Sequence, residues 1–357
     1  DDNMFLVGSP KRDGTGTVEL YFNPGENLWV HSQTMRPSNP EGRPPALRFG
    51  QSVSLAPIQN HPGLDRIALV GAPSSGAAYI YAIEVADDDQ EEIDVRTNQV
   101  GHLDANLPEA SLFGFQVAIQ ETNVGVRAVV GAPGRIEEEA STHGSVYVYN
   151  LLPDGAPSAE PAQRLIPPDS QPGDYFGLAL DVDGDYLVVG APGFDKPGYL
   201  DFGATYVYRF NSDVQLFELV ERLSVAQRDA GDGLFGHSVS ISGTSIVVGA
   251  PLDESEDEMV AKPNNGRAYA FRQTSAEPGS PAYTHTHTFK ASDNAQFDRF
   301  GESVDHSNQT VIIGATQKDV GGRANAGAAY LFTMDAALCT QDGSCVCLEG
   351  DEHNCQP

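Results

Sequence analysis

A three-part motif recurs along the chain with a period of about 60 residues, and this repeat constrains the fold more than any other feature. The first part is a Phe-Gly pair that opens a short alternating run, as in RFGQSVSL and LFGHSVSI. It occurs five times, and its glycines are separated by 64, 63, 59 and 65 residues. These glycines are Gly50, Gly114, Gly177, Gly236 and Gly301.

Two further motifs follow each Phe-Gly pair in the same order. The second is an apolar run that ends in Gly-Ala-Pro, with the variants GSP in the first copy and GAT in the last; its glycines are Gly8, Gly71, Gly131, Gly190, Gly249 and Gly314. The third is an aromatic-rich run with six copies, which read GTVELYF, GAAYIYAI, GSVYVYNL, GATYVYRF, GRAYAFRQ and GAAYLFTM. Three motifs with one period predict one structural unit repeated along the chain.

Each unit reads as four antiparallel strands. The apolar runs are short, rich in β-branched and aromatic residues, and bounded by Gly, Pro or Asp, which is typical of strands. A more polar run closes each unit, and its charges suit the outer edge of a sheet; the copies read NLWVHSQT, EEIDVRTN, AQRLIPP, LFELVERLSV and YTHTHTFKA. Radial repetition of such units predicts an all-β β-propeller over residues 1–334, with a cysteine-rich tail at 335–357. We expect the Phe of each Phe-Gly pair to wedge between neighbouring blades.

Composition excludes two classes of partner. The net charge of −29 argues against nucleic acid, because binding phosphates needs a cationic surface. The sequence has no apolar run of about 18 residues, so we expect no helix to span a membrane. Gly and Pro number 37 and 24, which suits a turn-rich β protein.

All four cysteines lie in the tail, at Cys339, Cys345, Cys347 and Cys355. A clustered, even set predicts disulfide bonds, whose pairing stays open, and hence an oxidising compartment. A zinc site is the rival interpretation, but this spacing matches no common zinc pattern.

These motifs resemble the FG-GAP repeats of the integrin α-subunit head and of many secreted proteins, over about residues 1–334. The resemblance implies a β-propeller that is extracellular and engaged in adhesion or assembly. The tail resembles part of an EGF-like module, which often ends with Cys-x-Cys and a later Cys.

The chain departs from that family in its acidic turns. Integrin-like repeats often carry a calcium loop of the form D-x-D-x-D-G-x-x-D. Only Asp181, Asp183 and Asp185 approach this pattern, in a short Asp-Gly turn without the last aspartate. They are the candidate Ca²⁺ ligands, although such a turn supplies few of the six to eight oxygens that calcium prefers. No other cofactor is expected.

The repeat count predicts six blades, or seven if strands are missing. Five Phe-Gly runs for six Gly-Ala-Pro runs leave the first blade without its inner strand, which would precede Asp1. The outer strand of the last blade would come from 335–357. Three explanations for this seam stay open: removed upstream residues, closure by the cysteine tail, or a strand from another subunit.

Other candidate sites are isolated. His285 and His287 alternate and are expected on one strand face, where they could hold a metal, although an exposed outer strand explains them as well. His237 follows a Phe-Gly pair and is expected to pack at a blade edge. Asn308 begins the sequon Asn-Gln-Thr on a predicted turn, so it is a candidate glycosylation site. Acidic runs at 86–94, 135–141 and 252–259 predict solvated loops, with weak calcium binding or a basic partner as the alternative.

The sequence therefore predicts an extracellular or cell-surface structural or adhesive propeller that contacts other proteins or glycans. The alternative is a self-assembling subunit of an extracellular filament, joined at the seam and the tail. Catalysis is not expected, because no nucleophile or metal motif occurs. Asp305 and His306 form the one reactive pair that a glycan hydrolase could use.

Overall fold

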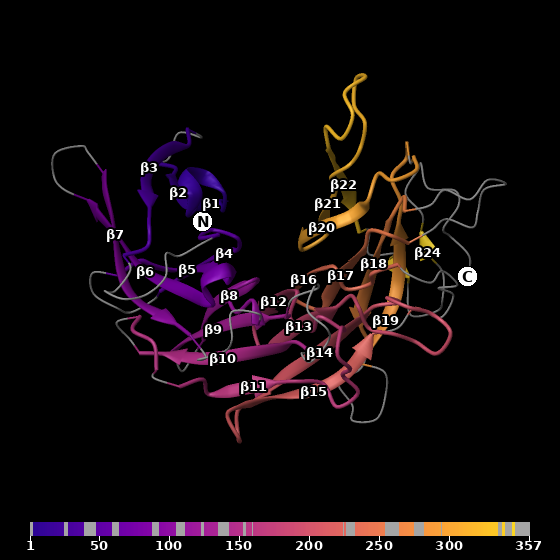
Figure 1. Cartoon of the computed structure of the whole chain (residues 1–357), viewed down its shortest axis with the longest axis horizontal. Helices are drawn as coiled ribbons and strands as arrows, with labels where there is room; N and C mark the ends of the chain where they lie inside the picture. Colours follow the sequence, from indigo (N-terminus) through magenta and orange to yellow (C-terminus); the bar gives the residue numbers. More distant parts are fainter. Residues whose placement is uncertain are drawn as a thin grey trace.

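The computed structural model describes residues 3–24, 28–38, 48–58, 64–87, 93–104, 111–122, 125–134, 143–152, 155–158, 160–223, 225, 233–253, 264–274, 282–293, 295–334, 338–339 and 345–346. It is an all-β β-propeller of six consecutive blades, as the repeat predicts. The four middle blades have four antiparallel strands each, and the first and last blades have three. Figure 1 shows the blades following one another around an arc, with blade 1 and blade 6 at its two ends.

The strands of the first three blades are as follows. Blade 1 contains β1 (Met4–Ser9), β2 (Thr17–Phe22) and β3 (Val30–Met35). Blade 2 contains β4 (Val53–Pro57), β5 (Arg66–Ala72), β6 (Ala77–Asp87) and β7 (Ile93–Leu103). Blade 3 contains β8 (Val117–Thr122), β9 (Gly125–Ala132), β10 (Ser145–Leu151) and β11 (Gln163–Leu165). Two short 3₁₀ turns, η1 (Arg12–Gly14) and η2 (Pro73–Ser75), connect second and third strands.

The remaining blades repeat this order. Blade 4 contains β12 (Ala179–Asp183), β13 (Tyr186–Ala191), β14 (Ala204–Asn211) and β15 (Leu216–Leu223). Blade 5 contains β16 (Ser238–Ser242), β17 (Ser245–Ala250), β18 (Arg267–Gln273) and β19 (Tyr283–Phe289). Blade 6 contains β20 (Phe300–Ser307), β21 (Thr310–Ala315) and β22 (Ala328–Thr333).

Each strand corresponds to one predicted run. The Phe-Gly run forms the inner strand, the Gly-Ala-Pro run the second strand, the aromatic run the third, and the polar run the outer strand. The second strands of the four middle blades are almost fully buried because both faces are covered by neighbouring blades; Arg66–Ala72 and Ser245–Ala250 are examples. The four-strand order within a blade is therefore confirmed.

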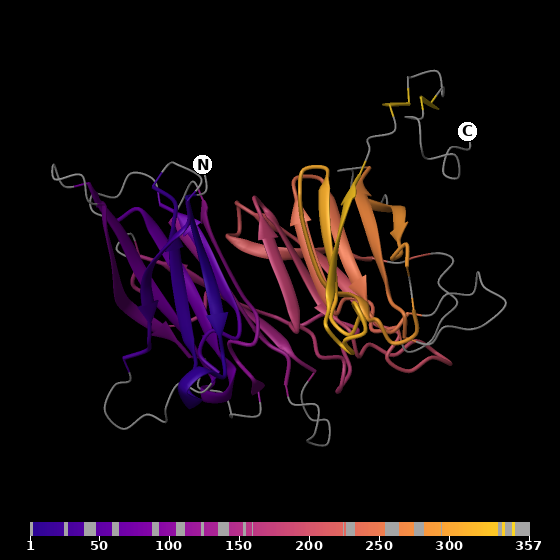
Figure 2. The same ribbon diagram turned by 90° about the horizontal axis from the view of Figure 1, so that it is seen from above.

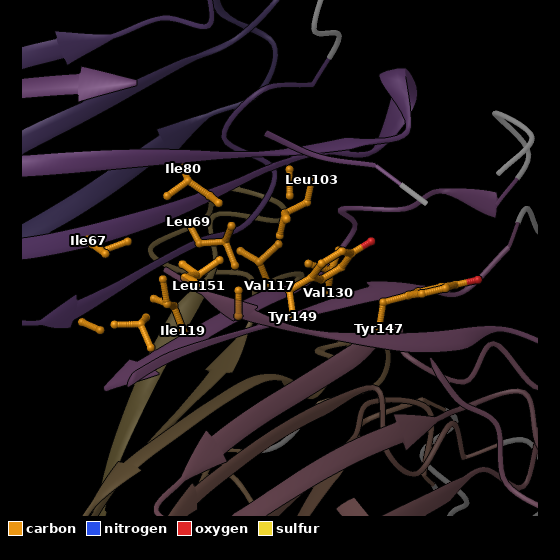
Figure 3. Packing of buried hydrophobic residues seen from close by; sticks show 14 of the residues in the cluster. Ile67, Leu69, Ile80, Leu103, Val117, Ile119, Val130, Tyr147, Tyr149 and Leu151 are labelled. Atoms are coloured by element: carbon orange, nitrogen blue, oxygen red, sulfur yellow. The ribbon is translucent and has the colours of Figure 1, made fainter. Parts of the chain in front are cut away.

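The hydrophobic core lies between blades rather than inside one of them. Between blades 2 and 3, Leu69 and Ile80 face Val117, Val130 and Tyr149, and Figure 3 shows these side chains pointing toward one another. The Phe of the Phe-Gly pair belongs to the same cluster. The ring of Phe113 stacks edge-on against Tyr147, with 5.5 Å between ring centroids. The predicted wedge is confirmed, and this Phe also packs on the third strand of its own blade.

The tail does not add a strand to blade 6 in the described part of the chain. β23 (Leu338–Cys339) and β24 (Cys345–Val346) pair only with each other, and β20–β21–β22 form the whole of the last sheet. Figure 2, seen from above, shows this pair standing apart from the blades. No helix among the described residues is long and apolar enough to cross a membrane.

Candidate functional site

Neighbouring blades meet at a close backbone contact that is repeated at each interface. A Cβ on the Gly-Ala-Pro glycine of each of the first five blades would lie closer than 3.0 Å to the carbonyl oxygen of the next Phe-Gly glycine. The pairs are Gly8 with Gly50, Gly71 with Gly114, Gly131 with Gly177, Gly190 with Gly236, and Gly249 with Gly301. Only glycine leaves room for this approach. The second motif is therefore the place where the next blade docks.

A ladder of hydrogen bonds reinforces these interfaces near the centre of the arc. The inner strand is an edge strand, so its outward N–H groups have no strand partner. Side chains of the preceding blade accept from them. Ser54 Oγ accepts from the N–H of Ile119 at 3.1 Å, and Ser240 Oγ accepts from the N–H of His306 at 3.3 Å.

The candidate calcium ligands take part in this ladder. Asp181 Oδ2 accepts from the N–H of Ile241 at 2.8 Å, and Asp183 Oδ2 accepts from the N–H of Gly243 at 2.6 Å. Burial raises the pKa of Asp181 to about 6. Asp185 is exposed in the adjoining turn. Among the described residues, no group of three or more His, Cys, Asp or Glu side chains is placed to hold a metal ion. Calcium binding by these three aspartates stays a prediction.

Blade 6 presents an uncovered copy of the surface that every middle blade buries. The paired residues Leu69 and Ile80 are fully buried in blade 2. The equivalent pair in blade 6, Ile312 and Leu331, is 46% and 72% exposed. On β20, the inner-strand residues Ser303, Asp305 and Ser307 are exposed too. We call the surface formed by Ser303, Asp305, Ser307, Ile312, Gly314 and Leu331 the receiving face.

Gly314 occupies the docking position of the receiving face. A Cβ there would approach only the rotatable hydroxyl of Ser303 closely, and the next nearest atoms lie 3.7 and 3.8 Å away. Its backbone does not have a positive φ. Within the described chain, neither close backbone contact nor conformation therefore requires glycine at this position.

Blade 1 presents a different surface at the opposite end of the arc. The ring of Phe5 stacks on Tyr21 at 4.9 Å between centroids and meets Trp29 edge-on at 4.7 Å. Phe5 and Trp29 are 37% and 42% exposed. We call the surface formed by Phe5, Val7, Tyr21 and Trp29 the aromatic face. Exposed apolar surface of this kind is typical of protein contact sites.

A buried carboxylate borders the aromatic face. Glu19 lies where Tyr147 and the other third-strand tyrosines stand in later blades. Its oxygens accept from Arg12 Nη1 at 2.8 Å and from Thr34 Oγ1 at 2.6 Å, and His31 Nε2 lies at 2.7 Å. The hydrogen bond from Thr34 lowers the pKa of Glu19. The cluster could not be predicted from the sequence, because pairing of β2 with β3 brings His31 and Thr34 to Glu19 and the turn η1 positions Arg12.

The prediction that His285 and His287 share one strand face is wrong. A β-bulge shifts the register between Ala270 and Phe271, so that His285 pairs with Phe271 and His287 with Ala270. Successive residues of β18 point to opposite faces, and the two histidines therefore do as well. His285 packs on Phe271, with 5.7 Å between ring centroids.

The candidate reactive pair of blade 6 meets at the hydroxyl of Ser240 in blade 5, which donates to Asp305 Oδ1 at 3.2 Å. His306 is buried, and its Nδ1 lies 3.1 Å from Ser240 Oγ, whereas Asp305 is exposed. Burial lowers the pKa of His306. His237 is half-buried at the boundary between blades 5 and 6, with Nε2 3.5 Å from Glu302 Oε1.

Asn308 is exposed in the turn between β20 and β21, and its glycosylation stays a prediction. Cys339 and Cys345 are directly opposite in the β23–β24 pair. Cys347 and Cys355 lie outside the described residues, as does most of the acidic runs at 86–94, 135–141 and 252–259.

Two features have no signal in the sequence. Arg127 is only 3% exposed, and its guanidinium lies 3.7 Å over the ring of Phe210 in blade 4. A cavity of about 170 Å³ between blades 4 and 5 is lined mainly by Phe194, Phe202, Phe235 and Leu223, with Lys196 and Arg222 beside them. Arg222 forms an ion pair with Asp169, with 2.6 Å between Nη1 and Oδ2, so its charge is already balanced.

Parts of the chain resemble a known repeat family, and its fold resembles those of solved structures. Residues 161–208, 222–271 and 283–332 match the model of the FG-GAP repeat. No match was found among curated proteins. Among solved structures, it is similar to Sqt1 of Saccharomyces cerevisiae (12% identity, 89% of this chain and 69% of that chain, TM-score 0.45). It is also similar to a protein from Lactobacillus plantarum (11% identity, 97% and 95%, TM-score 0.43). With three matched repeats in blades 3 to 6, the chain is a six-bladed β-propeller that carries FG-GAP repeats.

Proposed function

We propose that this chain is an extracellular structural propeller that works through protein contacts made at the two ends of its arc. The observation that carries the proposal is the exposure of apolar side chains on both end surfaces, with Phe5 and Trp29 on blade 1 and Ile312 and Leu331 on blade 6. Large apolar side chains in contiguous exposed positions cost solvation free energy unless a partner covers them.

Features of the sequence support the extracellular location. The clustered cysteines, whose spacing resembles part of an EGF-like module, suit an oxidising compartment. Asn308 stands exposed where a glycan could be attached. Mass spectrometry of the protein from its natural source tests both points: we expect the four cysteines to be oxidised, and free thiols in all four would contradict the location.

The second candidate function is that of a filament subunit. The receiving face and the aromatic face differ, so contact between them in two copies would be heterologous, and such contacts extend into open chains when the rotation does not close. This arrangement would join blade 6 of one copy to blade 1 of the next. An adhesive role toward a separate protein or a glycan would instead use one end alone.

Analytical ultracentrifugation and electron microscopy of three variants test the proposal. Phe5→Asp and Leu331→Asp place a charge in the aromatic face and in the receiving face. The matched control is Leu219→Asp, because Leu219 is 41% exposed on β15, an outer strand far from both ends. We expect association with self or partner to be lost in the first two variants and kept in the control. Equal association in all three would overturn the proposal.

We propose that the protein works without catalysis. The support is that His306 is buried at the interface of blades 5 and 6, where its Nδ1 lies 3.1 Å from Ser240 Oγ, and that the same hydroxyl donates to Asp305 Oδ1 at 3.2 Å. A glycan hydrolase that used His306 would show turnover, and His306→Ala would abolish it. That result would contradict the proposal.

A further inference from the structure

We propose that the receiving face of blade 6 is a docking site for a β-strand that carries a Phe-Gly pair and is supplied by a partner chain. The inference rests on the proposed function, which locates protein contacts at the ends of the arc. It adds the chemistry of the partner at one of these ends. Strand addition at the edge of a sheet is an established mode of peptide recognition.

The five interfaces inside the molecule define what fits the receiving face. At each of them the carbonyl group of a Phe-Gly glycine lies against the Gly-Ala-Pro glycine of the preceding blade. Blade 6 keeps this glycine as Gly314, although no residue of the described chain approaches it in this way. A larger residue would be tolerated in the chain alone, so the glycine matches a backbone that arrives from outside.

Polar and apolar groups of the receiving face follow the same pattern. Ser303 and Asp305 stand at the positions of Ser52 and Ser54, whose hydroxyls accept from the N–H groups of Val117 and Ile119 in the next inner strand. Ile312 and Leu331 stand where Leu69 and Ile80 are buried against an inner-strand valine. An incoming strand of the form Phe-Gly-x-x-Val would therefore donate the N–H of its Val to Ser303 and the N–H two residues later to Asp305, and its Val would cover Ile312.

The described residues have no Phe-Gly strand to spare. Each of the five Phe-Gly pairs of the repeat opens the inner strand of its own blade, and each Phe ring packs on aromatic side chains there. The tail, residues 335–357, contains no phenylalanine. The aromatic face of blade 1 also lacks a Phe-Gly strand in the described residues. The described residues of a second copy therefore cannot fill the site without opening one of their own blades.

The test is the binding of a fluorescent peptide to the full chain, measured by anisotropy. The peptide has the sequence of residues 48–56, and the control peptide carries Phe49→Ala and Gly50→Ala. The protein variant is Gly314→Ala, whose Cβ would overlap the incoming carbonyl group but would meet only the Ser303 side chain in the free chain. We expect the wild-type peptide to bind, and binding to weaken at least about tenfold with either the control peptide or the Gly314→Ala protein.

A second experiment applies if binding of the free peptide is too weak to detect. Such weak binding would arise because ordering an isolated strand costs conformational entropy. Residues 48–55 are joined directly before Asp1, in register with the inner strands of the other blades, which raises the effective concentration to the millimolar range. We expect this fusion to raise Tm by about 3 °C relative to the same fusion with Phe49→Ala and Gly50→Ala. Gly314→Ala should cancel the rise.

Two results would overturn the proposal. One is the absence of any difference between the wild-type and double-alanine strands in both experiments. The other is self-association of the chain without peptide that Gly314→Ala abolishes, because the occupant would then be a second copy. If only the strand proposal is wrong, Phe5→Asp and Leu331→Asp still abolish association. If the proposed function is also wrong, these two variants associate as the control does.

Discussion

Asp181 carries a carboxylate where Ser54 and Ser240 use a hydroxyl for the same bond to the next blade. Burial raises its pKa from an ordinary 3.8 to about 6, so the folded protein holds this proton at pH values where the unfolded chain has released it. Between about pH 4 and 6, the contribution of Asp181 to stability therefore falls as pH rises. We expect Asp181→Ser to keep the bond to Ile241 and to raise the free energy of unfolding by about 1 kcal/mol at pH 7.

Urea unfolding at pH 4.5 and pH 7 measures this difference. The gain from Asp181→Ser should be larger at pH 7, and a gain that is equal at both pH values would contradict the assignment. Repeating the pH 7 measurement with calcium also tests the metal prediction, because calcium bound at Asp181 would stabilise the wild type and not the variant.

His306 gives a pH dependence of the opposite sign. Burial lowers its pKa, while Asp305 and Asp183 act to raise it. The unfolded imidazole takes up its proton near pH 6.5, before the folded one, so stability falls as pH drops through 6.5. Residues at the equivalent position elsewhere include Ile119 and Ile241. We expect His306→Ile to flatten the stability profile between pH 7.5 and about 5.5, as followed by thermal unfolding; a profile unchanged in slope would show that other groups cause it.

Arg127 is a buried cation held by aromatic rings. Its Nε and Nη1 atoms have no hydrogen-bond partner among the described residues, and burial lowers its pKa. We expect Arg127→Met to change the free energy of unfolding by less than about 1 kcal/mol, because a long apolar side chain keeps the packing on Phe210 and removes the desolvation cost. Arg127→Ala should cost about 2–3 kcal/mol through the cavity it leaves. Chemical denaturation distinguishes the two, and equal losses would indicate that the charge itself stabilises the fold.

Among the blades, two equivalent glycines should respond differently to the same substitution. A Cβ on Gly249 would overlap the carbonyl oxygen of Gly301, whereas a Cβ on Gly314 meets only the hydroxyl of Ser303. We expect Gly249→Ala to destabilise the chain by roughly 2–4 kcal/mol and Gly314→Ala by less than about 0.5 kcal/mol. Thermal unfolding of the pair measures this contrast, and similar losses would mean that the glycine is needed within its own blade.

The strands could be predicted from the sequence because each blade is built from contacts between neighbouring runs. The Gly-Ala-Pro and aromatic runs gave the second and third strands of all six blades. The bulge that separates His285 from His287 could not be predicted, since strict alternation gives no sign of an extra residue. The role of Asp181 was missed for another reason: its partner Ile241 lies 60 residues away. Aligning the inner strands on Ser54 and Ser240 would have revealed it.

In the described part of the chain, the blades form a row in which the middle four have two neighbours and the first and last have one. Arrays of this kind approximate a sum of unit and interface stabilities. We expect the amides of β1–β3 and β20–β22 to exchange hydrogen faster than those of β9–β10 and β13–β14, because their blades have one interface and three strands. Hydrogen exchange with mass spectrometry tests this gradient. Uniform protection across the blades would show that the arc unfolds as one cooperative unit.

The ladder between inner strands gives the arc a direction. Every bond described here runs from a side-chain acceptor in one blade to an N–H donor in the following one, as from Ser54 to Ile119 and from Asp181 to Ile241. Among the described residues, the row therefore ends in exposed side-chain oxygens at Ser303, Asp305 and Ser307, of which Asp305 Oδ1 accepts from Ser240 Oγ. A backbone that continues the ladder at blade 6 must present N–H groups to these oxygens, so addition at that end proceeds with a single orientation.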